Sequence, residues 1–438
     1  MGGSLRISET LAKRLLQGDI ALAKQIASAP IVPRRDNFVE RPWGGTALRR
    51  FKRCELPDQG GTTTVTVGEA FEIAAFDTDR EAARYPSRLR FDDGSELTLP
   101  ELLARHGEVI LGRSFVARHG ACFPLLPKTL DIRELLSVQA HSPGDTELYV
   151  IIDAEPGATI RLGFSADVDG GKLSDELALG LRRQRELLES LTPQTDQHRL
   201  QAVLKAWFAD RGAGMAGVEA DLYPLLGDGD PWPPVADLLG ELKGLFWRVL
   251  DLLNTIPVAA GQIIHNATPR RLLAGSSRLP SAEVHALGNP ERREILALEV
   301  RRPGPTFRAW DNVRFPVREV DIDTAIAALN LRRTSAADFV VEPRAVPGRT
   351  GVYCSVDSPV FRVEHLRPHA QASVAVPAEA PHSLHVLAGD VAVVGADGHL
   401  LGNLARGDSA LVPIGVGGYA VHTDTSADIV KASLPPLL

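Results

Sequence analysis

LLSVQAHSPGDTELYVIIDAEPGATIRLGF, residues 135–164, reads as two β-strands joined by a tight turn. Three polar residues, Gln139, His141 and Glu147, interrupt a pattern that Leu, Val and Ile otherwise fill. Residues i and i+2 of a strand face the same side, so Gln139 and His141 should point together. If residues 142–146 form the turn of a hairpin, Glu147 pairs with His141 and all three side chains project from one face.

Such a face indicates part of a metal site. An amide oxygen, an imidazole and a carboxylate are ligands that Zn²⁺ accepts, and a catalytic zinc keeps one position open. The alternative is that Gln139 and Glu147 lie on the solvent face of an edge hairpin. A metal site also needs a fourth ligand. His285, in LPSAEVHALG (279–288), is a candidate, although a lone histidine in such a position is more often a hydrogen-bonded core residue.

The surrounding chain alternates between β-rich and helical segments. Short apolar runs with Gly, Pro and Asp turns, typical of all-β structure, fill about 62–164 and return after residue 256. Helical spacing of apolar residues marks 5–30 and 174–254. We therefore predict a mainly β fold of two cupin-type jelly-roll barrels with a helical insertion and an N-terminal helical arm. The predicted parts are an arm (1–33), a discontinuous catalytic barrel (34–173 and 256–340), the helical insertion (174–255) and a C-terminal cupin-like barrel (341–438).

Composition excludes several classes of protein. The net charge of −7 leaves no excess of Lys and Arg for nucleic acid. No run approaches the ~20 apolar residues of a membrane span, and the N-terminus lacks the apolar run of a signal peptide. Three distant cysteines without a CxxC pair suit a reducing compartment. We expect a cytoplasmic protein without nucleic-acid or membrane partners; the sequence leaves its oligomeric state open.

Seven phrases in order resemble class I mannose-6-phosphate isomerases (phosphomannose isomerases) of the cupin superfamily. They cover roughly two thirds of the chain, in its β-rich portions. The phrases are NFVERPWGG (37–45), GEAFEIAAF (68–76), LLPKTLDIRELLSVQAH (125–141), TELYVIIDAEPGATIRLGF (146–164), IPVAAGQ (256–262), LPSAEVHALG (279–288) and ALEVRRPGPTFRAWDN (297–312).

The resemblance implies a metal site and a set of catalytic residues. Matched phrase by phrase, the family's metal ligands, which normally hold zinc, fall on Gln139, His141, Glu147 and His285. The expected activity is a metal-dependent aldose–ketose isomerisation between mannose 6-phosphate and fructose 6-phosphate, by proton transfer between C1 and C2 through a cis-enediol. The family's essential arginine matches Arg308 and its acidic partner Glu299. Residues that line the family's substrate pocket match Lys128 and Ser137, and we count Lys128 among the catalytic residues.

Four departures bear on the substrate. The family's His-Pro-Asp and long lid loop become His141-Ser142-Pro143-Gly144, and the Gln-rich tract before the arginine becomes 300–305. Residues 265–278 are inserted, and the N-terminal helices are extra. Four added arginines provide either a rebuilt phosphate site or solvated surface charge: Arg270, Arg271, Arg301 and Arg302. The C-terminal part has His382 and His385 without a complete ligand set, so we expect it to be structural.

Two other functions therefore remain open. One is a cupin isomerase or epimerase for another sugar, phosphorylated or free. The other is a catalytically inactive metal-binding sugar-sensing homologue. An iron-dependent cupin oxygenase suits this ligand set poorly, because only two of the ligands are histidines. An assay of mannose 6-phosphate turnover with and without a chelator distinguishes the isomerase from these other functions.

Overall fold

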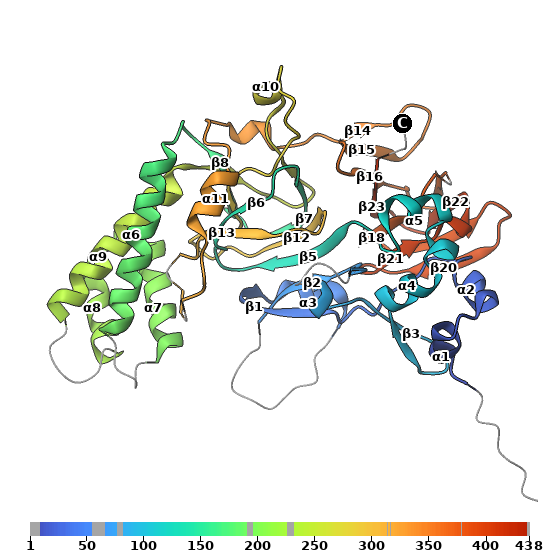
Figure 1. Ribbon diagram of the computed structural model, residues 1–438, viewed down its shortest axis with the longest axis horizontal. Coiled ribbons are helices and arrows are strands. Elements are labelled where there is room, and N and C mark those ends of the chain that lie inside the picture. Colours follow the sequence, from blue (N-terminus) through green and yellow to red (C-terminus); the bar gives the residue numbers. More distant parts are fainter. Residues whose placement is uncertain are drawn as a thin grey trace, which may run out of the picture.

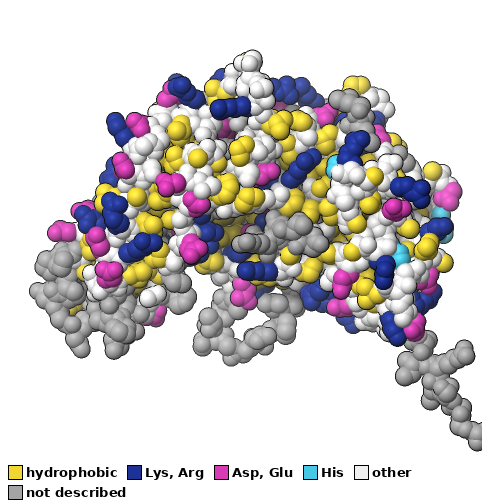
Figure 2. Space-filling model, in the orientation of Figure 1, with side chains coloured by type: hydrophobic (Ala, Val, Ile, Leu, Met, Phe, Trp, Pro, Cys, Tyr) yellow, Lys and Arg dark blue, Asp and Glu magenta, His cyan; other side chains and the backbone are white. Residues whose placement is uncertain are grey.

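The computed structural model describes most of the chain. The described residues are 9–54, 66–76, 82–190, 196–225, 232–312, 314–315, 317–377 and 379–435. Among them, no helix is long and apolar enough to cross a membrane. Basic and acidic side chains are interspersed over the face shown in Figure 2, without a continuous basic surface.

Two β-sheets in the middle of the chain face each other, and we call this pair the central sandwich (Figure 1). Its six-stranded sheet has the order β1-β2-β5-β12-β7-β10, with bounds Phe38–Gly45, Val67–Phe71, Leu126–Ile132, Ile295–Arg301, Glu147–Ala154 and Ile263–Asn266. Its five-stranded sheet has the order β13-β6-β11-β8-β9, with bounds Thr306–Trp310, Val138–His141, His285–Ala286, Thr159–Phe164 and Leu253–Pro257. Apolar side chains of both sheets meet in one interior cluster, which includes Leu130, Ile132, Ile160 and Leu162.

A second pair of sheets, the C-terminal sandwich, follows residue 340. Its six-stranded sheet has the order β14-β15-β16-β23-β18-β21, with bounds Arg344–Ala345, Val352–Asp357, Arg362–Leu366, Asp428–Ser433, His382–Ala388 and Ser409–Val412. Its four-stranded sheet has the order β17-β22-β19-β20, with bounds Ala372–Val376, Tyr419–Thr423, Val391–Gly395 and Leu400–Leu404. A small hairpin, β3 (Arg88–Arg90) and β4 (Glu96–Thr98), turns at Gly94, whose φ of +80° suits glycine.

Helices gather at both ends of the molecule (Figure 1). At one end, helices of the predicted insertion cover the outer face of the five-stranded sheet, where they bury Val138 and Ala140 of β6. These are α6 (Gly170–Glu189), α7 (Gln197–Ala209), α8 (Ala216–Leu222) and α9 (Trp232–Asp251), and α11 (Ile322–Ala328) packs with them. The other helices are α1 (Leu11–Leu16), α2 (Ile20–Ile26), α3 (Ala47–Lys52), α4 (Leu99–Ile110), α5 (Arg113–His119) and α10 (Arg270–Leu273).

The predicted mainly β class is confirmed in part. Sheets form both sandwiches, but the described helices hold nearly as many residues as the strands. The predicted hairpin between His141 and Glu147 is wrong. β6 belongs to the five-stranded sheet and pairs with β11 and β13, whereas β7 belongs to the six-stranded sheet and pairs with β10 and β12. Residues 142–146 therefore cross from one sheet to the other.

The two sandwiches pack back to back through the outer faces of their six-stranded sheets. Leu298 and Val300 of β12 share one apolar cluster with Val430 and Ala432 of β23. A buried cluster of polar side chains lies at the same junction. The carboxylate of Glu72, from the stretch GEAFEIAAF, accepts from Lys52 Nζ at 2.5 Å and from the hydroxyl of Ser409 at 2.7 Å.

We expect Lys52→Met to destabilise the fold by about 3–5 kcal/mol, the usual cost of leaving one partner of a buried ion pair uncompensated. Lys52 is 2% exposed and also donates to the carbonyl of Gly407 at 2.7 Å. Urea unfolding monitored by circular dichroism measures the effect. The control Lys13→Met, which removes a solvent-exposed pair with Glu9, should leave unfolding nearly unchanged. Equal effects of the two changes would contradict a stabilising role for this polar cluster.

Candidate metal centre

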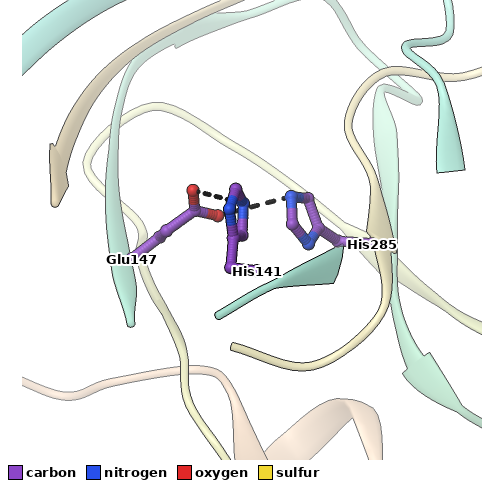
Figure 3. A group of neighbouring side chains, drawn as sticks. All are labelled: His141, Glu147 and His285. Carbon is purple, nitrogen blue, oxygen red and sulfur yellow. Dashed lines mark ion pairs between the residues drawn. The ribbon is translucent and has the colours of Figure 1, made fainter. Parts of the chain in front are cut away.

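Three side chains from three strands converge at one end of the central sandwich interior (Figure 3). His141 ends β6, Glu147 begins β7 and His285 begins β11. His141 Nε2 lies 2.8 Å from Glu147 Oε1, and His285 Nε2 lies 3.3 Å from Glu147 Oε2. The two imidazole rings stack with centroids 5.1 Å apart. All three residues are buried, at 1–3% exposure, so this is a dry group of potential ligands.

Backbone carbonyls orient both imidazoles toward the carboxylate. His141 Nδ1 lies 3.2 Å from the carbonyl oxygen of Pro305, and His285 Nδ1 lies 2.9 Å from that of Glu283. A carbonyl only accepts, so in neutral His141 the proton is on Nδ1 and Nε2 presents a lone pair to Glu147. His285 Nδ1 also lies 3.1 Å from Asn266 Nδ2. A hydrogen bond from the ring nitrogen that does not bind the ion fixes the tautomer of a metal-binding histidine.

The protonation states of the cluster favour a cation. Burial lowers the pKa of His141 to about 4, so its ring is neutral at pH 7. Burial alone would raise the pKa of Glu147, but the positive charge that His141 and His285 carry when protonated, together with Arg301, holds that pKa well below its usual value. The site therefore combines the neutral imidazole of His141 and the ionised carboxylate of Glu147 with a second imidazole, that of His285.

The arrangement fits one divalent metal ion. The ligand atoms of His141, Glu147 and His285 lie within 4.8 Å of one another, and two ligands of a tetrahedral zinc are separated by about 3.4 Å. His141 Nε2 is buried and, although close to Glu147, has no partner at hydrogen-bonding geometry. A metal ion bound there would give this nitrogen the partner that it lacks.

Gln139 lies next to this group. It is the Cα partner of His285 across the β6–β11 ladder, so both side chains point to the same face. Its Nε2 donates to Ser137 Oγ at 2.8 Å, which leaves the amide oxygen for another partner. The predicted pocket residue Ser137 is thus buried in direct contact with a predicted ligand.

A lysine and a second carboxylate lie further along the six-stranded sheet. Lys128 and Glu299 are Cα partners across the β5–β12 ladder, and Glu299 is also opposite Tyr149 of β7. Lys128 Nζ lies 3.8 Å from Glu299 Oε2 and 4.7 Å from the ring centroid of Phe71. Burial raises the pKa of Glu299 to about 7; Lys128 opposes this rise and Glu147 adds to it. A carboxyl group with that pKa can take up and release a proton near neutrality.

Arg308 lies on β13 of the five-stranded sheet, which also carries Gln139. It is the Cα partner of Gln139 across the β13–β6 ladder, which places it on the same side as the predicted ligands. The guanidinium is half-buried, and Nη1 donates to the carbonyl of Glu319 at 3.2 Å. The predicted site residues thus come from both sheets, with Arg308 and Gln139 facing Glu299 and Lys128 across the interior.

Sequence reasoning did not place three residues around Glu147, although it named one of them, Arg301, in another role. The hydroxyl of Tyr149 donates to Glu147 Oε2, Arg301 Nη1 lies 3.2 Å from Oε1, and Asn266 Nδ2 donates to Oε2 at 3.4 Å. Tyr149 lies two residues along the same strand, so the period-two rule was signal enough to find it. Arg301 was expected either to bind phosphate or to be surface charge; instead it is buried against Glu147.

Solved structures with the same fold include phosphomannose isomerases. No family model matches the chain. The mannose-6-phosphate isomerase of Bacillus subtilis has a solved structure that superposes with a TM-score of 0.59 at 19% identity, covering 93% of this chain and 100% of that one. An E134H mutant of the phosphomannose isomerase from Salmonella typhimurium superposes with a TM-score of 0.57 at 16% identity, over 94% of this chain and all of that one. The resemblance to these enzymes is therefore confirmed at the level of the fold.

Sequence similarity is confined to a shorter segment. Mannose-6-phosphate isomerase ManA of Bacillus subtilis is 33% identical over 141 residues, which cover 30% of this chain and 39% of that protein. The mannose-6-phosphate isomerase of Streptococcus mutans is 31% identical over 135 residues, covering 28% of this chain and 37% of that protein. The matched segment thus spans less than two fifths of these relatives.

Proposed function

We propose that this chain is a metal-dependent aldose–ketose isomerase that interconverts mannose 6-phosphate and fructose 6-phosphate. The observation that carries the proposal is the buried group of His141, Glu147 and His285 within a phosphomannose isomerase fold. The metal ion is zinc, with Gln139 as fourth ligand. A solved structure of mannose 6-phosphate isomerase bound with zinc and yttrium superposes with a TM-score of 0.56 at 16% identity, which supports this choice.

The proposal includes the architecture. The two sandwiches correspond to two cupin-type jelly-roll barrels, the first formed by 34–173 and 256–340 and the second by 341–438. Residues 1–33 form the helical arm and 174–255 the insertion. Strands β9 to β13 support the discontinuous barrel, because they pair with strands between residues 126 and 164. We also propose a cytoplasmic location, which the three free cysteines support.

The chemistry divides among the residues of the site. A metal ion bound here would polarise the sugar carbonyl and stabilise the enediolate. Glu299, buried and with a pKa of about 7, acts as the base that moves the proton between C1 and C2. Lys128, 3.8 Å away, holds Glu299 in place and compensates its charge. Arg308 supplies a permanent positive charge for the developing oxyanion.

The pH dependence follows from Glu299. The base must be ionised, so we expect kcat/KM to rise with pH, to be half-maximal near pH 7 and to level off above it. Steady-state rates from pH 5 to 9 measure this limb, and Glu299→Gln should lose it together with most turnover. A limb that persists in Glu299→Gln would assign the base to another residue.

Assays of the purified protein test the proposed function. We expect turnover of mannose 6-phosphate, its loss in a chelator, its return on adding Zn²⁺, and about one metal ion per chain by elemental analysis. Bound metal without turnover of any sugar would support the sensing homologue. Metal-dependent turnover of a different sugar would support the metal site but replace mannose 6-phosphate as the substrate.

One observation favours keeping another sugar as the second candidate. Of the four added arginines, Arg301 is engaged by Glu147 and by the carbonyls of Arg302 and Gly304, and Arg271 pairs with Asp338. Arg302 donates to the carbonyl of Val360 at 3.1 Å. Three of the four added arginines therefore already have partners within the protein, which leaves fewer of them to bind a phosphate group than the sequence suggested. A free sugar or a different sugar phosphate should be assayed beside mannose 6-phosphate.

A further inference from the structure

A cavity of about 610 Å³ opens at the C-terminal sandwich, away from the metal centre. It lies between α5 and the interior side of β16 and β23, and Figure 1 places α5 beside these strands. Its volume falls within the roughly 300–1,000 Å³ of small-molecule sites, which often occupy the mouths of β-barrels.

The cavity and the metal centre lie on opposite sides of the packed sheets. Along β23, Val430 and Ala432 face the junction between the sandwiches, so Lys431 and Ser433 face the other way, into the cavity. Along β12, Leu298 and Val300 face the same junction, so Glu299 points into the central sandwich. Two sheets therefore separate the sites.

The cavity borders a cluster with excess positive charge. The carboxylate of Glu364, 1% exposed, contacts three cations: Lys431 Nζ at 3.0 Å, Arg349 Nη1 at 2.9 Å and Arg362 Nη2 at 3.0 Å. Burial alone would raise the pKa of Glu364, but these cations lower it, so it stays ionised. The second carboxylate near Arg362, Asp357, is 3.5 Å away and largely exposed.

One buried negative charge thus faces three cations, and buried charge is costly without a counter-ion. Arg362 Nε is buried without a hydrogen-bond partner in the described structure, and Arg362 lines the cavity. Arg113 and Arg118 of α5 lie at the exposed rim, and Arg113 pairs there with Glu108 at 3.4 Å. Among the described residues, Glu379 is the one carboxylate that lines the cavity. Burial lowers the pKa of His119 beside them, so that ring adds little charge at pH 7.

The remaining wall is apolar. Phe115 of α5, Leu111 at the end of α4 and Ile414 line it. A cavity with cations and a hydroxyl on one side and apolar side chains on the other suits a ligand with an anionic group and a ring or apolar body. Phosphate matches the charge excess better than carboxylate, because both accept two bonds from one guanidinium but phosphate carries up to two negative charges.

We propose that this cavity binds a small organic phosphate. Its phosphate group lies against Arg362, Lys431 and Ser433, and its body lies against Phe115 and Ile414. The site is independent of the proposed isomerase activity, since it shares no residue with the metal centre.

Phenyl phosphate, which joins a phosphate to a ring, is the probe for calorimetric titration. The variants are Arg362→Gln and Arg118→Ala in the cavity, Arg90→Ala as an exposed arginine elsewhere, and His285→Ala to remove the metal centre. We expect one binding event in the wild type that persists in Arg90→Ala and His285→Ala. In Arg362→Gln the affinity should fall about tenfold or more, as for loss of a charge-assisted contact. In Arg118→Ala it should fall by a smaller factor, because a positive charge at the rim attracts the phosphate without contacting it.

Each other outcome overturns a stated part of the proposal. No binding, or binding unchanged in both cavity variants, removes the site. Binding lost in His285→Ala assigns the probe to the metal centre. Benzoate binding as tightly as phenyl phosphate removes the phosphate preference, and inorganic phosphate doing so removes the role of the ring. A melting temperature for each variant checks folding; if Arg362→Gln fails to fold, the exposed Arg118→Ala decides.

Discussion

His285→Ala should lose its bound metal and with it turnover, by roughly three orders of magnitude or more, because the electrophile and one of its ligands go together. The imidazole faces Glu147 Oε2 at 3.3 Å and is fixed by the carbonyl of Glu283 at 2.9 Å. Elemental analysis of the purified variant, next to its steady-state rate, measures both losses. His265, half-buried on β10 outside the ligand group, gives the control.

The control separates loss of metal from loss of packing. His265→Ala also removes an imidazole from the central sandwich, but it should keep metal and turnover because its ring lies against Phe361 and not against Glu147. A His285→Ala protein that retains stoichiometric metal would contradict the ligand assignment. Full loss of metal with normal turnover would instead make the metal structural.

The strand pattern predicted which side chains meet but not how the strands are arranged. Period-two alternation indicates which residues share a face, and that much held for Gln139 and His141 on β6. It contains no information about which sheet the next strand joins. Residues 142–146 cross between facing sheets, so Glu147 reaches His141 across the interior rather than along a ladder.

Long-range ion pairs were beyond sequence reasoning for a different reason. Arg301 stands in the run RRPGP, whose composition is that of an exposed turn. Its burial depends on Glu147 of the adjacent strand, and strand order is a tertiary property. The same holds for Lys52 and Glu72, which become partners only where α3, β2 and the C-terminal sandwich meet. The family resemblance supplied the second histidine, because periodicity alone gave His285 no more than a core position.

For Arg308, the sequence and the structure of β13 point to different roles. The phrase Thr306-Phe307-Arg308 predicts a catalytic arginine, whereas an isolated view of β13 shows a half-buried residue tied to the carbonyl of Glu319. The register of β13 favours the first view. Arg308 is opposite Gln139, and Gln139 is opposite His285, so the three lie in one row across the sheet. A guanidinium at the end of that row adjoins the predicted metal ligands.

Arg308→Ala should therefore lower kcat/KM by roughly two orders of magnitude or more while metal content and melting temperature stay near the wild-type values, as for loss of one preorganised charge. Arg308→Lys should recover part of the rate, since it restores the charge without the planar fork. Arg332→Ala, an exposed arginine paired with Asp167, is the control and should be silent. Near-normal turnover in Arg308→Ala with full metal would exclude the catalytic role. Loss of metal and fold together in that variant would instead show that β13 needs the arginine to hold its place beside β6, which is the structural alternative.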